Sequence, residues 1–303
     1  MKWKRGKKSR DVIDIRGASG GSSGGRSGLP IPTGLAGAGG GVGLIVVLVI
    51  VGINLFGGGS GGSGDGGFGL PSAFGPAAGA PGAEDPQPLD PSEDPQADLK
   101  DFSSYVFTDA QDTWEGTVDG YDRAELVLYS GEVSTGGCGG ATSAVGPFYC
   151  PADERVYLDL TFYEDMERQL GASGDFAWAY VIAHEVGHHV QNLTGTSGEV
   201  DRLSREDPGQ ANELSVRQEL QADCYSGVWA ATVFAEGDLE AGDLDEAFGA
   251  AEAVGDDRLQ KQAGGRVNPD SFTHGTSEQR REWFERGYES GEPADCDTFS
   301  GDI

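Results

Sequence analysis

The sequence predicts an α+β protein: a mostly helical domain with a small sheet, standing behind one N-terminal transmembrane helix and a disordered linker. Two observations separate these parts, because an apolar run covers residues 42–56 and residues 57–96 are rich in glycine and proline. A third observation concerns the remainder of the chain. There, two short stretches are strand-like, the second of them alternating with period two, and several longer segments repeat apolar residues at helical spacing.

Residues 1–34 form a tail that is basic at first and then rich in glycine and serine. Ahead of the apolar run, eight Lys and Arg residues outnumber two Asp residues. Residues 17–41 show no hydrophobic period. Such a composition predicts a flexible tail.

A membrane anchor is predicted at residues 35–56. The apolar run 42–56 is 15 residues long, and the Ala- and Gly-rich stretch before it extends it to 22, enough for one crossing of about 20 residues. All the basic residues of the tail precede it, so the N-terminus is expected in the cytoplasm and the rest of the chain outside. A cleaved signal peptide is the alternative, but no A-x-A site follows Phe56 closely.

Residues 57–96 are expected to be a tether between the anchor and the folded domain. They contain 12 Gly and 7 Pro and become acidic toward their end. A segment of this composition cannot bury enough apolar surface to fold. It would hold the domain away from the bilayer.

The charge of the chain excludes one class of partner. Beyond the tail, 48 acidic residues face 13 basic ones, and the whole chain carries a net charge of −29. So acidic a surface repels phosphates, which argues against nucleic-acid binding. Solubility is the simpler interpretation of this charge.

Residues 97–303 are expected to form one domain of about 200 residues. The expected elements are helices at 98–114, 161–170, 176–194, 210–235 and 244–253, a last helix starting at 276, and strands at 125–129 and 155–160. Capping boxes are predicted where Thr161 precedes Glu164 and where Thr276 precedes Gln279. The polar stretch 196–209 is expected to be a connector that tolerates insertion.

A metal-binding motif, His184-Glu185-Val186-Gly187-His188, lies within an apolar segment that is predicted to be helical. Two histidines four residues apart on a helix project from one face, so both imidazoles can reach one zinc ion. The glutamate between them then lies beside the open position of the metal. This is the pattern of a metal-dependent peptidase, although a motif this short also occurs by chance.

A catalytic zinc site needs a third protein ligand. The chain has only four histidines, and since His189 is expected to point away from the metal, the ligand is His274 or a carboxylate. Glu219 and Asp223 are four apart on a predicted helix, so Glu219 is expected to bind the metal while Asp223 accepts the second N–H of a ligating histidine. Alternatively, Glu219 is a surface carboxylate, and Asp223 pairs with Arg217 or Arg280.

The four cysteines, Cys138, Cys150, Cys224 and Cys296, lack a close C-x-x-C pair. This spacing argues against a zinc knuckle and for disulfides in an extracytoplasmic domain. Of three possible pairings we expect Cys138–Cys150 and Cys224–Cys296. Reduced, buried thiols are the alternative.

Several stretches resemble one known family: HEVGHHVQ, ELQADC, CGGATSAVGPFYCPAD, DSFTHGTSEQR and the opening MKWKRGKKSRDVIDIRG. They are similar to the bacterial predicted neutral zinc metallopeptidases, membrane-anchored proteins of the zincin group. The resemblance implies a zincin-like domain with one Zn²⁺ and Glu219 as its third ligand. It also suggests that one of the two predicted strands is the sheet edge along which a peptide substrate adds; the alternative is that either strand is simply part of the core.

In the catalytic interpretation, Glu185 takes a proton from zinc-bound water, whose pKa falls to about 7 on the metal, and later delivers it to the leaving amine. His274 is either a donor to the oxyanion or a structural histidine of its turn. Tyr149, Tyr157 and Tyr225 are weaker candidates for the oxyanion donor.

The predicted function is therefore a membrane-anchored zinc endopeptidase that hydrolyses proteins or peptides outside the cytoplasmic membrane. The alternative is a non-catalytic binding module of the cell envelope that keeps its metal for stability. Glu185 favours the enzyme, because a structural zinc site needs no general base. A non-peptide amide or ester remains a further substrate class, and the sequence gives no indication of the oligomeric state.

Overall fold

The computed structural model describes residues 1–4, 9–18, 81–82 and 87–303. The predicted anchor at 35–56 and most of the predicted linker lie outside these residues. Within the described ranges, no helix is both long enough and apolar enough to span a bilayer. The described chain is mostly helical with two small sheets, which confirms the α+β prediction.

A mixed four-stranded sheet has the strand order β1-β2-β6-β5. Its strands are β1 (Val12–Asp14), β2 (Glu125–Tyr129), β6 (Arg155–Asp159) and β5 (Phe148–Cys150). β2 runs parallel to both β1 and β6, whereas β5 is antiparallel to β6. The sequence correctly predicts β2 and β6, but both are internal. The expectation that one of them is the sheet edge is wrong, because the edges are β1 and β5.

Alternation along the strands divides the core into two parts. Leu126 and Leu128 of β2 face the main core, which also contains side chains of the helices α2 and α4, and Val127 and Tyr129 face a smaller core on the other side. That smaller core is covered by a hairpin of β3 (Glu132–Ser134) and β4 (Gly140–Thr142). The predicted disulfide Cys138–Cys150, which joins this hairpin to β5, is confirmed.

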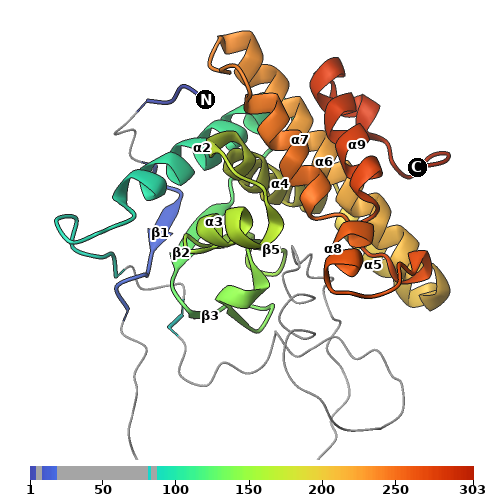
Figure 1. Cartoon of the computed structure of the whole chain (residues 1–303), viewed down its shortest axis with the longest axis horizontal. Helices are drawn as coiled ribbons and strands as arrows, with labels where there is room; N and C mark the ends of the chain where they lie inside the picture. Colours follow the sequence, from blue (N-terminus) through green and yellow to red (C-terminus); the bar gives the residue numbers. More distant parts are fainter. Residues whose placement is uncertain (5–8, 19–80, 83–86) are drawn as a thin grey trace, which may run out of the picture.

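Helices make up the rest of the domain. They are α2 (Ala97–Glu115), α3 (Phe162–Asp165), α4 (Asp175–Leu193), α5 (Thr196–Glu206), α6 (Ala211–Glu236), α7 (Asp243–Ala253), α8 (Asp256–Gln262) and α9 (Ser277–Ser290). Short turns of other helical types are η1 (Ser143–Val145), η2 (Met166–Leu170), η3 (Pro208–Gln210), η4 (Pro269–Ser271) and η5 (Pro293–Cys296). Figure 1 shows the strands toward one end of the molecule and α6, α7 and α9 toward the other, with α4 between them.

α6 and α9 approach each other at two glycines. A methyl group on Gly227 of α6 would overlap the carbonyl oxygen of Phe284, and one on Gly287 of α9 would overlap the carbonyl oxygen of Cys224. The two helices therefore pack backbone against backbone along this contact. The second predicted disulfide, Cys224–Cys296, is also confirmed and ties η5 to α6.

Two local predictions at residues 161–209 are wrong. The side chain of Thr161 caps no helix, because its Oγ1 donates to Asp159 at 2.8 Å. Most of the expected connector 196–209 is the helix α5, which buries Val200. At the last helix the predicted capping box is present, with Thr276 accepting from the N–H of Gln279 and the Gln279 side chain accepting from the N–H of Thr276.

Residues 1–4 and 9–18, here called the N-terminal segment, belong to the folded domain. β1 extends the sheet beside β2, and the α-ammonium of Met1 donates to Asp175 at 2.8 Å, at the first residue of α4. The prediction of a flexible tail is wrong for these residues. A three-residue strand is too short for a periodic signal, and its partner lies more than 100 residues away along the chain.

Candidate metal centre

α4 carries His184, Glu185 and His188 into the interior. The helix follows Gly174 and ends just before Gly195, whose φ of 87° lies in the left-handed region. His184 and His188 are 0% and 2% exposed. Their Nε2 atoms face each other 3.1 Å apart, as expected for histidines one turn apart on a single helix face.

α6 brings Glu219 to the same point. The two helices come close at Gly187, where a Cβ atom would lie 3.1 Å from the carbonyl oxygen of Ala222. Oε2 of Glu219 is 3.3 Å from Nε2 of His184, and Oε1 is 3.8 Å from Nε2 of His188. The structure thus assembles the three predicted ligands, with one ligand atom from each within 4.8 Å of the others.

Each histidine is oriented by a hydrogen bond from its other ring nitrogen. Nδ1 of His184 donates to Oδ1 of Asp223 at 2.9 Å, and Nδ1 of His188 donates to Oε1 of Gln191 at 2.8 Å. Both Nε2 atoms are therefore left to bind a cation. Gln191 is in turn held by the carbonyl of Gln218, to which its Nε2 donates at 2.7 Å.

The role of Gln191 escaped the sequence analysis. The available signal was its position three residues after His188, on the same face of the helix. Asp223, by contrast, occupies the predicted place beside His184. The two histidines consequently differ, since one is oriented by a carboxylate and the other by a neutral amide.

This difference changes their basicity. Burial lowers the pKa of both imidazoles, but the charge of Asp223 outweighs it at His184 and raises that pKa to about 9. At His188 burial dominates and the pKa falls to about 4. His184 is thus the more strongly electron-donating ligand.

Asp223 is itself held by a buried arginine. Arg280 of α9 donates from Nε to Oδ2 at 2.8 Å and from Nη2 to Oδ1 at 2.9 Å, and the hydroxyl of Tyr180 donates to Oδ1 at 2.5 Å. Nη2 of Arg280 is also 3.7 Å from Oε2 of Glu219. Although burial raises the pKa of Asp223, the guanidinium holds it well below its usual range.

Glu185 lies beside the ligands and is 0% exposed. Within the described part of the chain, neither of its oxygens makes a hydrogen bond of normal geometry. Burial, together with the charge of Glu219, raises the pKa of Glu185 to about 8. Glu219 behaves in the opposite way: burial raises its pKa, but the neighbouring imidazoles of His184, His188 and His274 lower it to about 2.

His274 lies in the turn before α9 and is 7% exposed. Its Nδ1 is 2.9 Å from Oγ1 of Thr273 and 3.4 Å from Oδ1 of Asp256. Burial lowers the pKa of His274, but Asp256 and the charge of Glu219 together raise it above the ordinary value. The turn itself is held by Asp256, whose Oδ2 accepts from the backbone N–H of Thr273, His274 and Gly275.

The other candidates make contacts away from the ligands. His189 donates to the carbonyl of Asp122 at 2.6 Å and accepts from the hydroxyl of Tyr149 at 2.9 Å, so it points away from the site as predicted. The hydroxyl of Tyr157 donates to Asp153, and the ring of Tyr225 packs edge-on against Trp114.

The donor set fits a zinc ion. Two imidazole nitrogens and one carboxylate oxygen converge from two helices, the composition typical of catalytic zinc with one position left for water or substrate. The buried carboxylate of Glu185 adjoins this set. His184, His188 and Glu219 would therefore hold the metal, and Asp223 and Gln191 would orient the histidines.

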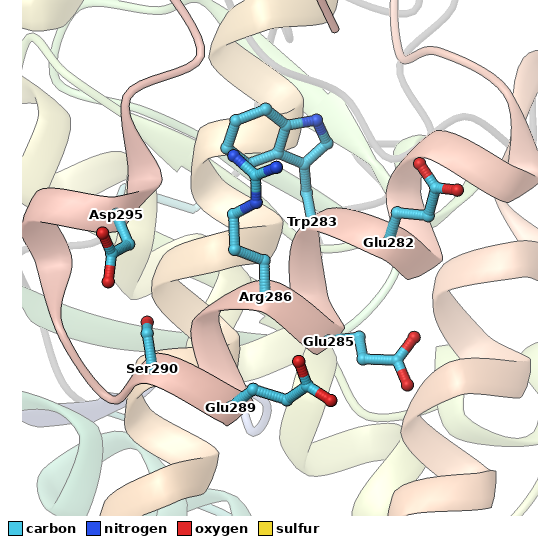
Figure 2. Close-up of a pocket in the computed structure, with 7 residues that line it drawn as sticks. All are labelled: Glu282, Trp283, Glu285, Arg286, Glu289, Ser290 and Asp295. Carbon is cyan, nitrogen blue, oxygen red and sulfur yellow. The ribbon is translucent and has the colours of Figure 1, made fainter.

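Two other features do not belong to this site. A hollow of about 780 Å³ on α9 and η5 is lined by Glu282, Trp283, Glu285, Arg286, Glu289, Ser290 and Asp295. Figure 2 shows the guanidinium of Arg286 over the Trp283 ring, at 4.3 Å from its centroid. A second acidic group consists of Asp175, Asp243 and Glu246, and the ammonium of Met1 donates to Asp175 and Asp243 of this group.

The fold and the ligands define a class: α+β metalloproteins with an HExxH helix and a downstream glutamate. Comparison with known proteins shows the family. Residues 1–299 match the family described as "Putative neutral zinc metallopeptidase", and the chain belongs to it. The resemblance noted in the sequence is confirmed.

The relatives cover the chain to different extents. "Uncharacterized protein YpfJ" of Escherichia coli strain K12 is 46% identical over 310 residues, which cover 100% of both chains. "Uncharacterized protein Mb2605" of Mycobacterium bovis is 48% identical over 198 residues, 62% of this chain and 66% of that protein. No solved structure matches the chain significantly.

Proposed function

We propose that this protein is a zinc-dependent peptidase that hydrolyses internal peptide bonds of proteins or peptides. The observation that carries the proposal is Glu185, a buried carboxylate next to three converging ligands, whose oxygens make no hydrogen bond of normal geometry within the described residues. A purely structural zinc site normally closes its fourth position with protein and needs no base beside it. In a non-catalytic binding module, the buried carboxylate of Glu185 would have no function.

The residues of the chain have separate tasks. Zinc held by His184, His188 and Glu219 would polarise the scissile carbonyl and increase the acidity of a water molecule. Glu185, buried beside the ligands, accepts the proton of the attacking water and passes it to the leaving amine nitrogen. The C–N bond then breaks with a neutral amine as the leaving group.

His274 is proposed to donate a hydrogen bond to the oxyanion of the tetrahedral intermediate. Its raised pKa and its proximity to Glu219 suit a donor beside the metal. The alternative, a histidine that holds its own turn, is less well supported because Asp256 accepts the N–H groups of that turn.

The substrate is proposed to lie along β5. Of the two sheet edges, β5 is the one that packs against α4. The backbone N–H of Tyr149 in β5 is close enough to Glu185 to lower its pKa. An extended peptide aligned with this strand would place a bond beside the general base.

The domain is proposed to work outside the cytoplasmic membrane, because two disulfides persist only where thiols are not kept reduced. Attachment to the membrane through the apolar run at 35–56 is proposed as well, without assigning the residues before the run to the opposite side of the membrane. That run lies outside the described residues.

The test uses the full-length chain, since the N-terminal segment is part of the fold. Purified protein with zinc is incubated with a diverse peptide mixture, and cleavage is read by mass spectrometry. The Glu185→Gln variant should bind zinc at one equivalent without cleaving, whereas Glu206→Gln, a change at an exposed position of α5, should cleave normally. Undiminished cleavage by Glu185→Gln would refute the mechanism. If the parent protein binds zinc but cleaves no peptide, the result would support the non-catalytic binding module instead.

A further inference from the structure

The N-terminal segment is bonded to the domain along its backbone. Val12–Asp14 pair in parallel register with residues 126–128 of β2. The N–H of Leu126 donates to the carbonyl of Asp11 at 2.6 Å, and the N–H of Ile15 donates to the carbonyl of Leu128 at 2.9 Å. Ile15 is 2% exposed within the smaller core. β1 is therefore joined to the sheet both by backbone hydrogen bonds and by a buried side chain.

A buried ion pair fastens the end of this strand. Arg16 is 6% exposed and Asp94 is 8% exposed. The guanidinium donates to both oxygens of Asp94, at 2.7 and 3.2 Å, and to Asp14 of its own strand. A bidentate pair in this setting has a fixed geometry.

Met1 and Trp3 contact the helices of the domain, at a place separate from the sheet. The ring of Trp3 packs against Phe102 of α2 with 5.5 Å between centroids. The ammonium of Met1 donates to Asp175 of α4 at 2.8 Å and to Asp243 of α7 at 3.3 Å. The N-terminal segment thus touches the sheet, α2, α4 and α7, and its burial does not depend on a single contact.

These contacts conflict with the topology expected from the sequence. One crossing at residues 35–56 would place residues 1–34 and 97–303 on opposite sides of a membrane. The hydrocarbon core alone is about 30 Å thick, whereas backbone atoms of β1 and β2 are less than 3 Å apart. One molecule cannot satisfy both arrangements.

We infer that the N-terminal segment and the metal-binding domain lie in the same aqueous compartment. β1 completes the sheet whose far strand, β5, packs against the helix of His184 and His188. The described basic residues of this segment, Lys2, Lys4, Arg10 and Arg16, are then part of the domain, and they do not mark the cytoplasmic side of a single crossing. This inference does not rest on the proposed peptidase activity.

Thiol accessibility in membranes tests the inference directly. All four native cysteines are paired, so an added thiol is the single target of a membrane-impermeant maleimide. Arg10→Cys probes the N-terminal segment and Glu206→Cys probes the domain, and both positions are exposed. In spheroplasts that contain the full-length chain, we expect the two variants to be labelled equally before the membrane is permeabilised. Labelling of Glu206→Cys with protection of Arg10→Cys would overturn the inference.

A second measurement reports the strand pairing itself. Ile13 and Val127 are register partners, and both pack in the smaller core. The double variant Ile13→Cys, Val127→Cys should form an intramolecular disulfide on mild oxidation, seen after proteolysis without reductant. The pair Ile13→Cys, Glu206→Cys is the matched control and should not cross-link. The pairing of β1 with β2 is refuted if two results occur together in membranes. Ile13→Cys, Val127→Cys forms no disulfide, and Arg10→Cys and Glu206→Cys are labelled to different extents.

Discussion

Arg280 offers the sharpest test of how the metal centre is built. Its guanidinium is 0% exposed and makes two hydrogen bonds to Asp223, the residue that orients His184. Replacing it in Arg280→Gln leaves the Asp223 carboxylate buried without its counter-charge. We expect the free energy of unfolding to fall by about 3–5 kcal/mol, the usual cost of breaking a buried pair by removing one partner.

The same change should weaken zinc binding. Loss of the partner that orients a ligating histidine typically costs about 10- to 100-fold in metal affinity. Arg280→Lys keeps the positive charge but cannot reproduce the bidentate geometry, so an intermediate affinity is expected. Should the Gln variant fail to fold, the Lys variant still tests the orientation of Asp223.

The assays are urea unfolding followed by circular dichroism, and zinc affinity from competition with a chromophoric chelator. Arg281→Gln is the matched control: Arg281 is exposed and contacts Glu252 and the ring of Phe248, so its loss should cost about 1 kcal/mol or less. If both Arg280 variants bind zinc as tightly as Arg281→Gln and are as stable, the proposed role of the Arg280 guanidinium is refuted.

Three further predictions concern other contacts. Gln191→Ala removes the amide that orients His188 and should reduce zinc affinity by about 10-fold or more. Asn192→Ala, at the neighbouring residue, is the control. Equal zinc affinities of the two variants would show that His188 needs no amide partner. Gly227→Ala should destabilise the domain by about 1–3 kcal/mol or more in urea unfolding because its methyl group meets the backbone of α9, and an unchanged midpoint would contradict the close packing of α6 and α9. Burial raises the pKa of Asp94, but Arg16 and its other partners lower it from 3.8 to about 2. The resulting stabilisation, about 2 kcal/mol, is present above pH 4 and is lost as the pH falls toward 2, so unfolding measured from pH 5 to 2 should show a shallower loss in Asp94→Asn than in the parent.

The local parts of the site could be predicted because their spacing is a property of a single helix. His184 and His188 share a face of α4, and Glu219 and Asp223 share a face of α6, whatever the rest of the chain does. The need for a third ligand then singled out Glu219 by the chemistry of zinc. Gln191 was within reach of the same reasoning, since it lies three residues after His188.

Other features depend on residues that are distant in the sequence. No pattern within Val12–Asp14 indicates a strand, and its place next to β2 follows only from long-range pairing. The order of the strands, which makes β2 and β6 internal, is set by the same pairing. α5 escaped prediction because it is mostly polar and carries Gly198; in the structure the burial of Val200 and ion pairs such as Arg202–Glu206 support the helix.

The sequence by itself determined the candidate donor atoms of this protein, two imidazoles and a carboxylate, together with the i, i+4 spacing of the histidines and the position of Glu185, the proposed general base, between them. The tertiary structure decided where those atoms meet. It places α6 against α4 at Gly187, sets Arg280 of α9 on Asp223, and closes the sheet with the N-terminal segment. The physical reason is that covalent spacing constrains neighbours along one helix, whereas contacts between helices and strands depend on how all the buried surfaces pack together.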